Sequence, residues 1–164
     1  MNSSAHRKTI LAGFIGNILE WYDFAVYGYF APIIASHFFP SDDPTASLIA
    51  TFGVFAAGYM ARPIGGAIFG HIGDIYGRKL VLTLSVGLMG ISTFLIGVLP
   101  DHAAIGVSAS ILLLILRLLQ GLSVGGEFTG SIVFLVENAR ENRRGLTGSW
   151  ANFGAILGFL IGSG

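Results

Sequence analysis

The sequence predicts an all-α integral membrane protein with about five transmembrane helices. Of its 164 residues, 53% are hydrophobic and only 11% are charged, whereas a soluble domain carries about a quarter charged residues. Apolar runs of about 20 residues recur along the chain, and each is long enough to cross a hydrocarbon core of about 30 Å. Short polar segments separate the runs, so we expect a bundle in which consecutive helices are antiparallel neighbours.

The predicted spans begin after a short polar N-terminus, and no small-residue cleavage site follows the first of them. This first run is therefore expected to be a retained anchor and not a signal peptide. Five spans leave one helix without a packing partner, so we expect the chain to be the N-terminal part of a longer protein. A complete five-helix protein is the alternative. The spans are predicted at residues 10–34, 47–69, 80–99, 109–136 and 146–164.

Basic residues predict how the chain is oriented. They gather before the first span and in two of the four connections, while the other two connections hold only acidic charges, so the positive-inside rule places the N-terminus in the cytoplasm. A net charge of zero argues against a nucleic-acid partner. The absence of cysteine excludes disulfides and thiolate metal sites. The basic residues are Arg7, Lys8, Arg78, Lys79, Arg140, Arg143 and Arg144, and the acidic ones are Asp42, Asp43 and Asp101.

A polar stripe runs along the first span and comprises Asn17, Glu20, Asp23 and Tyr27. Steps of three or four residues place all of them on one face of a helix. An ionisable residue inside a span costs about 2.5–3.5 kcal/mol on insertion, so this face must contact protein or water. The stripe is either polar packing between helices or the lining of a pathway in which Glu20 or Asp23 takes up and releases a proton.

Two further spans carry polar residues. Arg62 lies about 12 Å inside the predicted cytoplasmic end of the second span, and Pro63 after it predicts a kink at the level of a cation. The alternative is that Arg62 snorkels to the inner surface. In the fourth span, Gln120 and Glu127 share a face and Arg117 can reach the same cavity.

Glycines at short intervals predict close helix packing in the fourth and fifth spans. A ten-residue charged segment between the second and third spans, residues 70–79, is predicted to be a short turn because its glycines allow sharp changes of direction. His71 and Asp74 have no further ligand-type residue nearby, so no metal, cofactor or catalytic residue is expected. The packing glycines are Gly121, Gly125, Gly126, Gly154, Gly158 and Gly162.

The charged segment resembles the G-x-x-x-D-x-x-G-R-K loop of major facilitator superfamily transporters. Together with residues 17–27, 62–66 and 117–127, it makes the chain similar to the metabolite:proton symporter branch, which includes proline/betaine, α-ketoglutarate, shikimate and citrate permeases. The resemblance implies a bacterial inner-membrane protein of twelve helices in two halves, of which this chain is most of the first. It also implies a small-molecule substrate, the proton as coupling ion and rocker-switch transport around a central cavity.

The same resemblance implies roles for individual residues. Arg117 and Gln120 match a fourth-span pattern associated with proton coupling, and Tyr76 departs from the basic residue that many relatives have at its position. Residues 126–130 and 144–150 look nearest to proline/betaine carriers, whereas Arg117 in place of a lysine leaves organic-acid permeases open. The implied cytoplasmic latch between the halves consists of Gly70, Asp74, Gly77, Arg78 and Lys79.

Transport is therefore the expected function, and an enzyme is not expected. Two other functions remain open from the sequence. A membrane sensor or interaction protein could use the same fold without transporting, although a pure scaffold would gain by losing its intramembrane charges. A passive facilitator would transport without a proton gradient.

Overall fold

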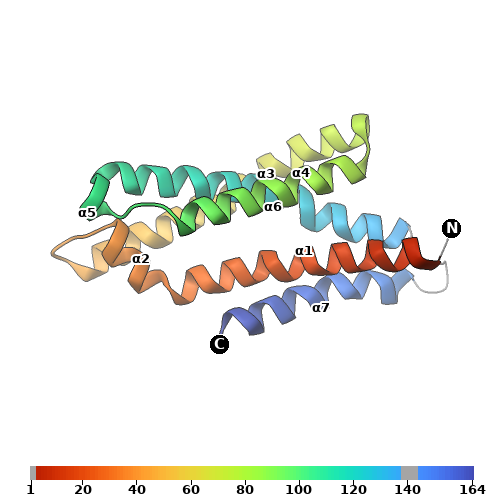
Figure 1. Ribbon diagram of the computed structural model, residues 1–164, viewed down its shortest axis with the longest axis horizontal. Coiled ribbons are helices and arrows are strands. Elements are labelled where there is room, and N and C mark those ends of the chain that lie inside the picture. Colours follow the sequence, from red (N-terminus) through yellow and green to blue (C-terminus); the bar gives the residue numbers. More distant parts are fainter. Residues whose placement is uncertain (1–2, 138–143) are drawn as a thin grey trace.

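The molecule is a bundle of long helices, with two short helices at one end (Figure 1). A computed structural model describes residues 3–137 and 144–164, and it describes their side chains except at 3–13, 78, 79, 126–137, 144, 147 and 151. In chain order the helices are α1 (Ser3–Tyr29), α2 (Ala31–Phe38), α3 (Pro44–Tyr76), α4 (Arg78–Gly97), α5 (His102–Ile105), α6 (Val107–Glu137) and α7 (Arg144–Gly162).

Within the described residues, three helical segments are long and apolar enough to cross a membrane: Pro44–Tyr76, Leu80–Gly97 and Val107–Gly125. A shorter apolar stretch, Gly148–Gly162, lies in α7. Together with α1 these segments form the long helices of the bundle (Figure 1). The prediction of an all-α integral membrane fold is confirmed.

The first predicted span ends earlier than expected. It was predicted to continue to residue 34, but α1 ends at Tyr29 and a separate helix, α2, follows. Pro32 lies at the start of α2, where its missing N–H is harmless, whereas in a continuous helix its ring would clash with a carbonyl one turn earlier. The Ser110 hydroxyl of α6 donates a hydrogen bond to the Phe38 carbonyl, which holds the end of α2 against the bundle.

The predicted turn over residues 70–79 is wrong in extent. Helix α3 continues through Gly70 and Asp74 to Tyr76, and the chain reverses at Gly77 alone. Gly77 has φ +92°, a conformation that favours glycine, and its N–H bonds to the Gly73 carbonyl at 3.0 Å. With 33 residues α3 is about 50 Å long, more than the bilayer core requires, and its end projects beyond the bundle with the start of α4 (Figure 1).

Glycines bring α3 and α6 into backbone contact. A Cβ atom on Gly121 would overlap the carbonyl oxygen of Gly58, and one on Gly65 would overlap that of Leu122. Gly125 contacts α3 in the same way, at the Arg62 carbonyl. The predicted packing role of Gly121 and Gly125 is confirmed. The contacts of Gly126 lie outside the part that the structure describes.

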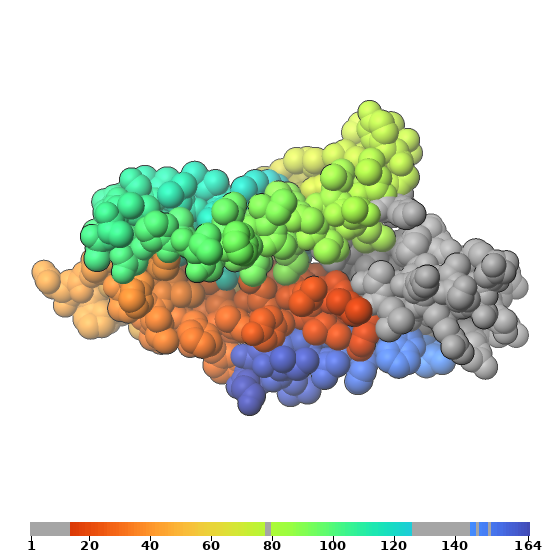
Figure 2. All heavy atoms as spheres, in the orientation of Figure 1, coloured from red at the N-terminus to blue at the C-terminus, as the bar shows by residue number. Residues whose placement is uncertain are grey.

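Helix α7 packs along α1 through a second set of glycines, and in Figure 2 its atoms lie along those of α1. A Cβ atom on Gly158 would overlap the Ile18 carbonyl, and one on Gly162 would meet Ala25. Gly154 lies against the ring of Phe14. The predicted close-packing face of the last span is therefore confirmed, and its partner is α1.

Candidate functional site

The polar stripe of α1 faces the interior of the bundle. Asn17, Glu20 and Tyr27 are at most 1% exposed, and the Asp23 side chain is 15% exposed. This burial confirms that the face contacts protein and not lipid. It also means that each charge on the stripe must find its compensation inside the bundle.

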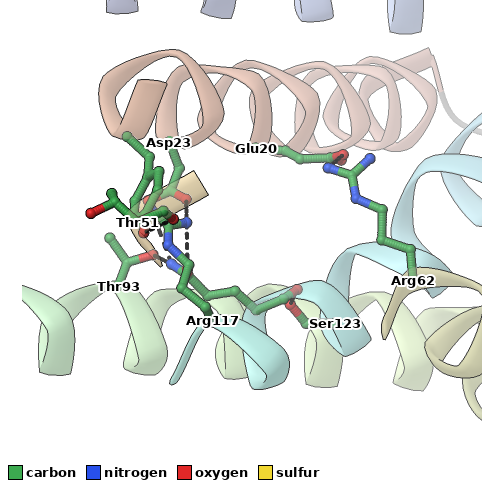
Figure 3. Close-up of polar contacts among 9 residues, drawn as sticks. Glu20, Asp23, Thr51, Arg62, Thr93, Arg117 and Ser123 are labelled. Atoms are coloured by element: carbon green, nitrogen blue, oxygen red, sulfur yellow. Dashed lines mark hydrogen bonds and ion pairs between the residues drawn. The ribbon is translucent and has the colours of Figure 1, made fainter. Parts of the chain in front are cut away.

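Asp23 meets Arg117 of α6 in a compact hydrogen-bonded group, the Asp23–Arg117 cluster (Figure 3). Nη1 of Arg117 lies 2.7 Å from Asp23 Oδ2 and 2.7 Å from Gln120 Oε1. The amide nitrogen of Gln120 donates to Thr93 Oγ1 of α4 at 2.7 Å and lies 3.4 Å from Asp23 Oδ1. Charge-assisted bonds of this length are the strong ones, so the cluster joins α1, α4 and α6.

The aromatic ring of Tyr27 lies against the guanidinium group of Arg117. The Arg117 guanidinium carbon lies 3.8 Å from the centre of the Tyr27 ring, close enough for a cation–π interaction. The Tyr27 hydroxyl donates to the Thr51 carbonyl of α3 at 3.0 Å, and the ring stacks on Phe55 at 5.4 Å. Tyr27 therefore fixes the orientation of Arg117 and connects α3 to the cluster.

Glu20, one turn earlier on α1, pairs with a different arginine. Arg62 Nη2 of α3 lies 3.5 Å from Glu20 Oε1, and the two side chains are 15% and 0% exposed. The Arg62 guanidinium carbon lies 4.1 Å from the centre of the Phe24 ring and 4.2 Å from that of Tyr59. Arg62 therefore points into the bundle, and snorkelling to the surface is not what the structure shows. Helix α3 continues through Pro63 without interruption.

The two carboxylates of α1 thus form two separate ion pairs (Figure 3). Each carboxylate has its own guanidinium, so the charges compensate in pairs within a low-dielectric interior. Both guanidiniums lie against aromatic rings, but the Asp23 pair is short and further hydrogen-bonded through Gln120, whereas the Glu20 pair is longer. Two neighbouring sites with different chemistry result.

The helix-packing glycines place the arginines. A Cβ atom on Gly58 would lie 3.0 Å from the Arg117 carbonyl oxygen, and the Gly121 contact with Gly58 comes directly after Gln120 in the chain. Gly125 touches the backbone of Arg62 itself. These contacts fix the backbones of Arg62 and Arg117 relative to each other, because both arginines lie where α3 and α6 touch.

The sequence predicted several of these residues and missed others. The pairing partners of Glu20 and Asp23, and the roles of Phe24, Tyr59 and Thr93, were not predicted. Phe24 and Tyr59 lie one turn from Glu20 and Arg62, a spacing that could have indicated them. Thr93 carries no such signal.

Some predicted site residues stand apart from the two ion pairs or outside the described side chains. Asp74 is exposed in the last turn of α3, and Gly70 lies one turn before it. The side chains of Glu127, Arg78 and Lys79 lie outside the described part of the chain. The latch role and the role of Glu127 remain predictions.

Comparison with known proteins gives consistent relatives. The chain is 46% identical over 158 residues to the proline/betaine transporter of Salmonella typhimurium. The aligned region covers 96% of this chain and 32% of the relative. It is equally identical, with the same coverage, to the glycine betaine/proline/ectoine/pipecolic acid transporter of Dickeya dadantii. It is 44% identical to an inner membrane metabolite transport protein of Escherichia coli, over 98% of this chain and 37% of the relative.

The chain spans about a third of the length of these curated relatives. No solved structure gives a significant match to it. The family model described as "Sugar (and other) transporter" matches residues 8–164, which is nearly the whole chain. The chain therefore belongs to the sugar (and other) transporter family of the major facilitator superfamily, and it resembles the proline/betaine permeases of that group.

Proposed function

We propose that this chain is the N-terminal part of a twelve-helix transporter that moves a small polar metabolite across a bacterial inner membrane by proton symport. The N-terminus is cytoplasmic in this proposal, and transport proceeds by alternating access. The observation that carries it is the buried Asp23–Arg117 cluster, which joins three helices through charged groups deep in an apolar bundle.

Charged groups at this depth are costly, so their presence needs a reason. Packing alone could be achieved more cheaply by apolar residues, since replacing a buried ion pair by well-packed apolar side chains is often neutral or stabilising. Relatives whose names include proline, betaine, ectoine and pipecolic acid support a compatible solute as substrate. Organic acids, which the sequence left open, are the alternative.

The cluster suggests how a proton could be coupled to movement. Asp23 is the more accessible of the two α1 carboxylates. A proton on Asp23 would neutralise it and remove the attraction that holds Arg117, so that α1 and α6 could shift relative to each other. Protonated and deprotonated forms would then favour different conformations, which is what coupling requires.

The first prediction concerns the proton gradient. In membrane vesicles containing the full-length protein, net uptake of labelled betaine or proline is expected to collapse when a protonophore is added, because accumulation then lacks its driving force. Counterflow exchange of labelled for unlabelled substrate is expected to survive and serves as the control. Net uptake indifferent to the protonophore would indicate a passive facilitator, and absence of any uptake would favour a non-transporting sensor.

A second prediction concerns the segment from Gly70 to Lys79. We propose that Asp74, which is exposed at the end of α3, helps to hold the cytoplasmic ends of the two halves together in one conformation, where contact between the halves would exclude water and strengthen its ionic contacts. Asp74→Asn is expected to lower the transport rate about tenfold by favouring the inward-facing state, with little change in substrate affinity within a state.

Single cysteines in the cytoplasmic cavity, probed with a thiol reagent, measure this shift; residues 1–164 contain no cysteine, and any cysteine in the rest of the full-length protein is replaced first. Asp42→Asn is the matched control, since Asp42 is also exposed but lies in the loop between α2 and α3, at the opposite end of α3 (Figure 1). Well-expressed Asp74→Asn protein with unaltered labelling would exclude the latch.

A further inference from the structure

We propose, on the basis of the transport function proposed above, that the Glu20–Arg62 pair is a zwitterion-exchange site. A substrate that carries a quaternary ammonium and a carboxylate would break this ion pair and form two new ion pairs, one with Glu20 and one with Arg62. Its ammonium would take the place of the Arg62 guanidinium between Phe24 and Tyr59, opposite Glu20. Its carboxylate would be bound by the displaced Arg62.

Phe24 and Tyr59 form an aromatic corner that already holds a cation. Their ring centres are 5.9 Å apart and their planes meet at 75°, and the guanidinium carbon lies close to both centres. Phe55 supports the Phe24 ring edge to face at 5.5 Å. Aromatic faces attract a cation without requiring N–H groups, so the corner suits a quaternary ammonium as well as it suits a guanidinium.

Arg62 is held less firmly than Arg117. Two of its buried nitrogen atoms, Nε and Nη2, have no hydrogen-bond acceptor within the part of the chain that the structure describes, compared with Nε alone for Arg117. Nη2 lies 3.5 Å from Glu20, compared with 2.7 Å between Arg117 and Asp23. A guanidinium with unused donors in a planar fork is suited to accept a carboxylate in bidentate geometry.

Charge balance selects the class of ligand. Glu20 and Arg62 are nearly enclosed, so a ligand that separates them must leave neither charge uncompensated. A zwitterion meets this condition, because its ammonium neutralises Glu20 and its carboxylate neutralises Arg62. A simple anion would bring no cation to replace Arg62 beside Glu20, and a simple cation would bring no anion to replace Glu20 beside Arg62. The site therefore favours zwitterionic solutes over organic acids.

The corner also distinguishes among zwitterions. A secondary ammonium, as in proline, has N–H groups that lose their water when they face aromatic rings. A trimethylammonium, as in glycine betaine, has no such groups to leave unsatisfied. Tyr59 is half-exposed, so one wall of the corner borders the surface of the described bundle.

The test is Tyr59→Leu in the full-length transporter, with uptake of betaine and of proline measured over a range of concentrations. The half-saturating concentration for betaine is expected to rise about tenfold, and that for proline by a smaller factor. Phe52→Leu is the matched control, because Phe52 lies two turns earlier on α3 and is also 49% exposed. Tyr59→Phe keeps the ring and is expected to behave like wild type.

Competition against labelled betaine gives a second measurement that needs no variant. Choline has the quaternary ammonium without a carboxylate, and acetate has a carboxylate without an ammonium, so each is expected to compete at least about tenfold more weakly than unlabelled betaine. Choline or acetate competing as well as betaine would overturn the exchange of charges, even if Tyr59→Leu failed to reach the membrane.

The outcomes separate this site from the proposed function. Wild-type protein that accumulates neither betaine nor proline would overturn the transport proposal itself. Wild-type protein that transports betaine, with Tyr59→Leu indistinguishable from Phe52→Leu, would overturn only the assignment of the aromatic corner. A selective loss of betaine affinity in Tyr59→Leu, with weak competition by choline and acetate, supports the zwitterion-exchange site.

Discussion

Replacing Arg117 by leucine is expected to abolish substrate accumulation. The change leaves Asp23 inside the bundle without its cation, and removing one partner of a buried pair costs about 3–5 kcal/mol. It also leaves Gln120 and Tyr27 without the guanidinium that they contact. Proton-driven uptake in vesicles and the amount of protein in the membrane are the two measurements.

Two further variants separate a pathway role of Arg117 from a packing role. Arg117→Lys keeps the charge but not the planar fork, so we expect normal membrane levels and accumulation reduced at least about tenfold. Combining Arg117→Leu with Asp23→Asn removes both charges, so membrane levels are expected to recover while uptake stays absent. Normal uptake by the double variant would show that the cluster only stabilises the fold.

Gly121→Ala is expected to have the second large effect. Its Cβ atom would overlap the Gly58 carbonyl oxygen and lie 3.1 Å from the Cβ of Ala61, so α3 and α6 must separate. Such overpacking costs about 1–3 kcal/mol, and it moves Arg117 and Gln120 away from Asp23. We expect a lower midpoint in thermal unfolding of the detergent-solubilised protein, together with strongly reduced uptake.

Gly90→Ala is the matched control for this variant. Gly90 is also in the interior of a long helix, but within the described part of the chain no atom of another helix lies within 4 Å of the position its Cβ would take. Alanine is the better helix former, so thermal stability is expected to be unchanged or slightly higher and uptake normal. If both glycine variants behaved alike, the α3–α6 backbone contact would not be what positions the cluster.

Much of the architecture was predictable from local features of the sequence. Long apolar runs predict membrane helices because the bilayer excludes unpaired backbone groups, and this holds whatever the helices pack against. The inward face of α1 followed from the spacing of Asn17, Glu20, Asp23 and Tyr27, since lipid excludes a charged stripe. Glycines every four residues likewise predicted the contact face of α7.

Helix ends were less predictable. Gly70 and Gly73 permit a turn but do not require one, and α3 keeps both within the helix because its hydrogen bonds continue to Tyr76. Among the three glycines of this segment, Gly77 is the one that adopts a positive φ, a conformation that other residues avoid. Pro32 lies at the break between α1 and α2, whereas Pro63 lies inside α3, so a proline alone did not decide where a helix ends.

The pairing of charges could not be obtained from the sequence. Spacing along one helix shows that Glu20 and Asp23 share a face, but it carries no information on which arginine each one meets. That depends on how far apart α1, α3 and α6 lie and how they are rotated, of which the glycine contacts between α3 and α6 set only the distance between those two helices. Helix formation and membrane insertion depend on neighbours along the chain, whereas ion pairs between helices depend on distances that arise only when the helices pack.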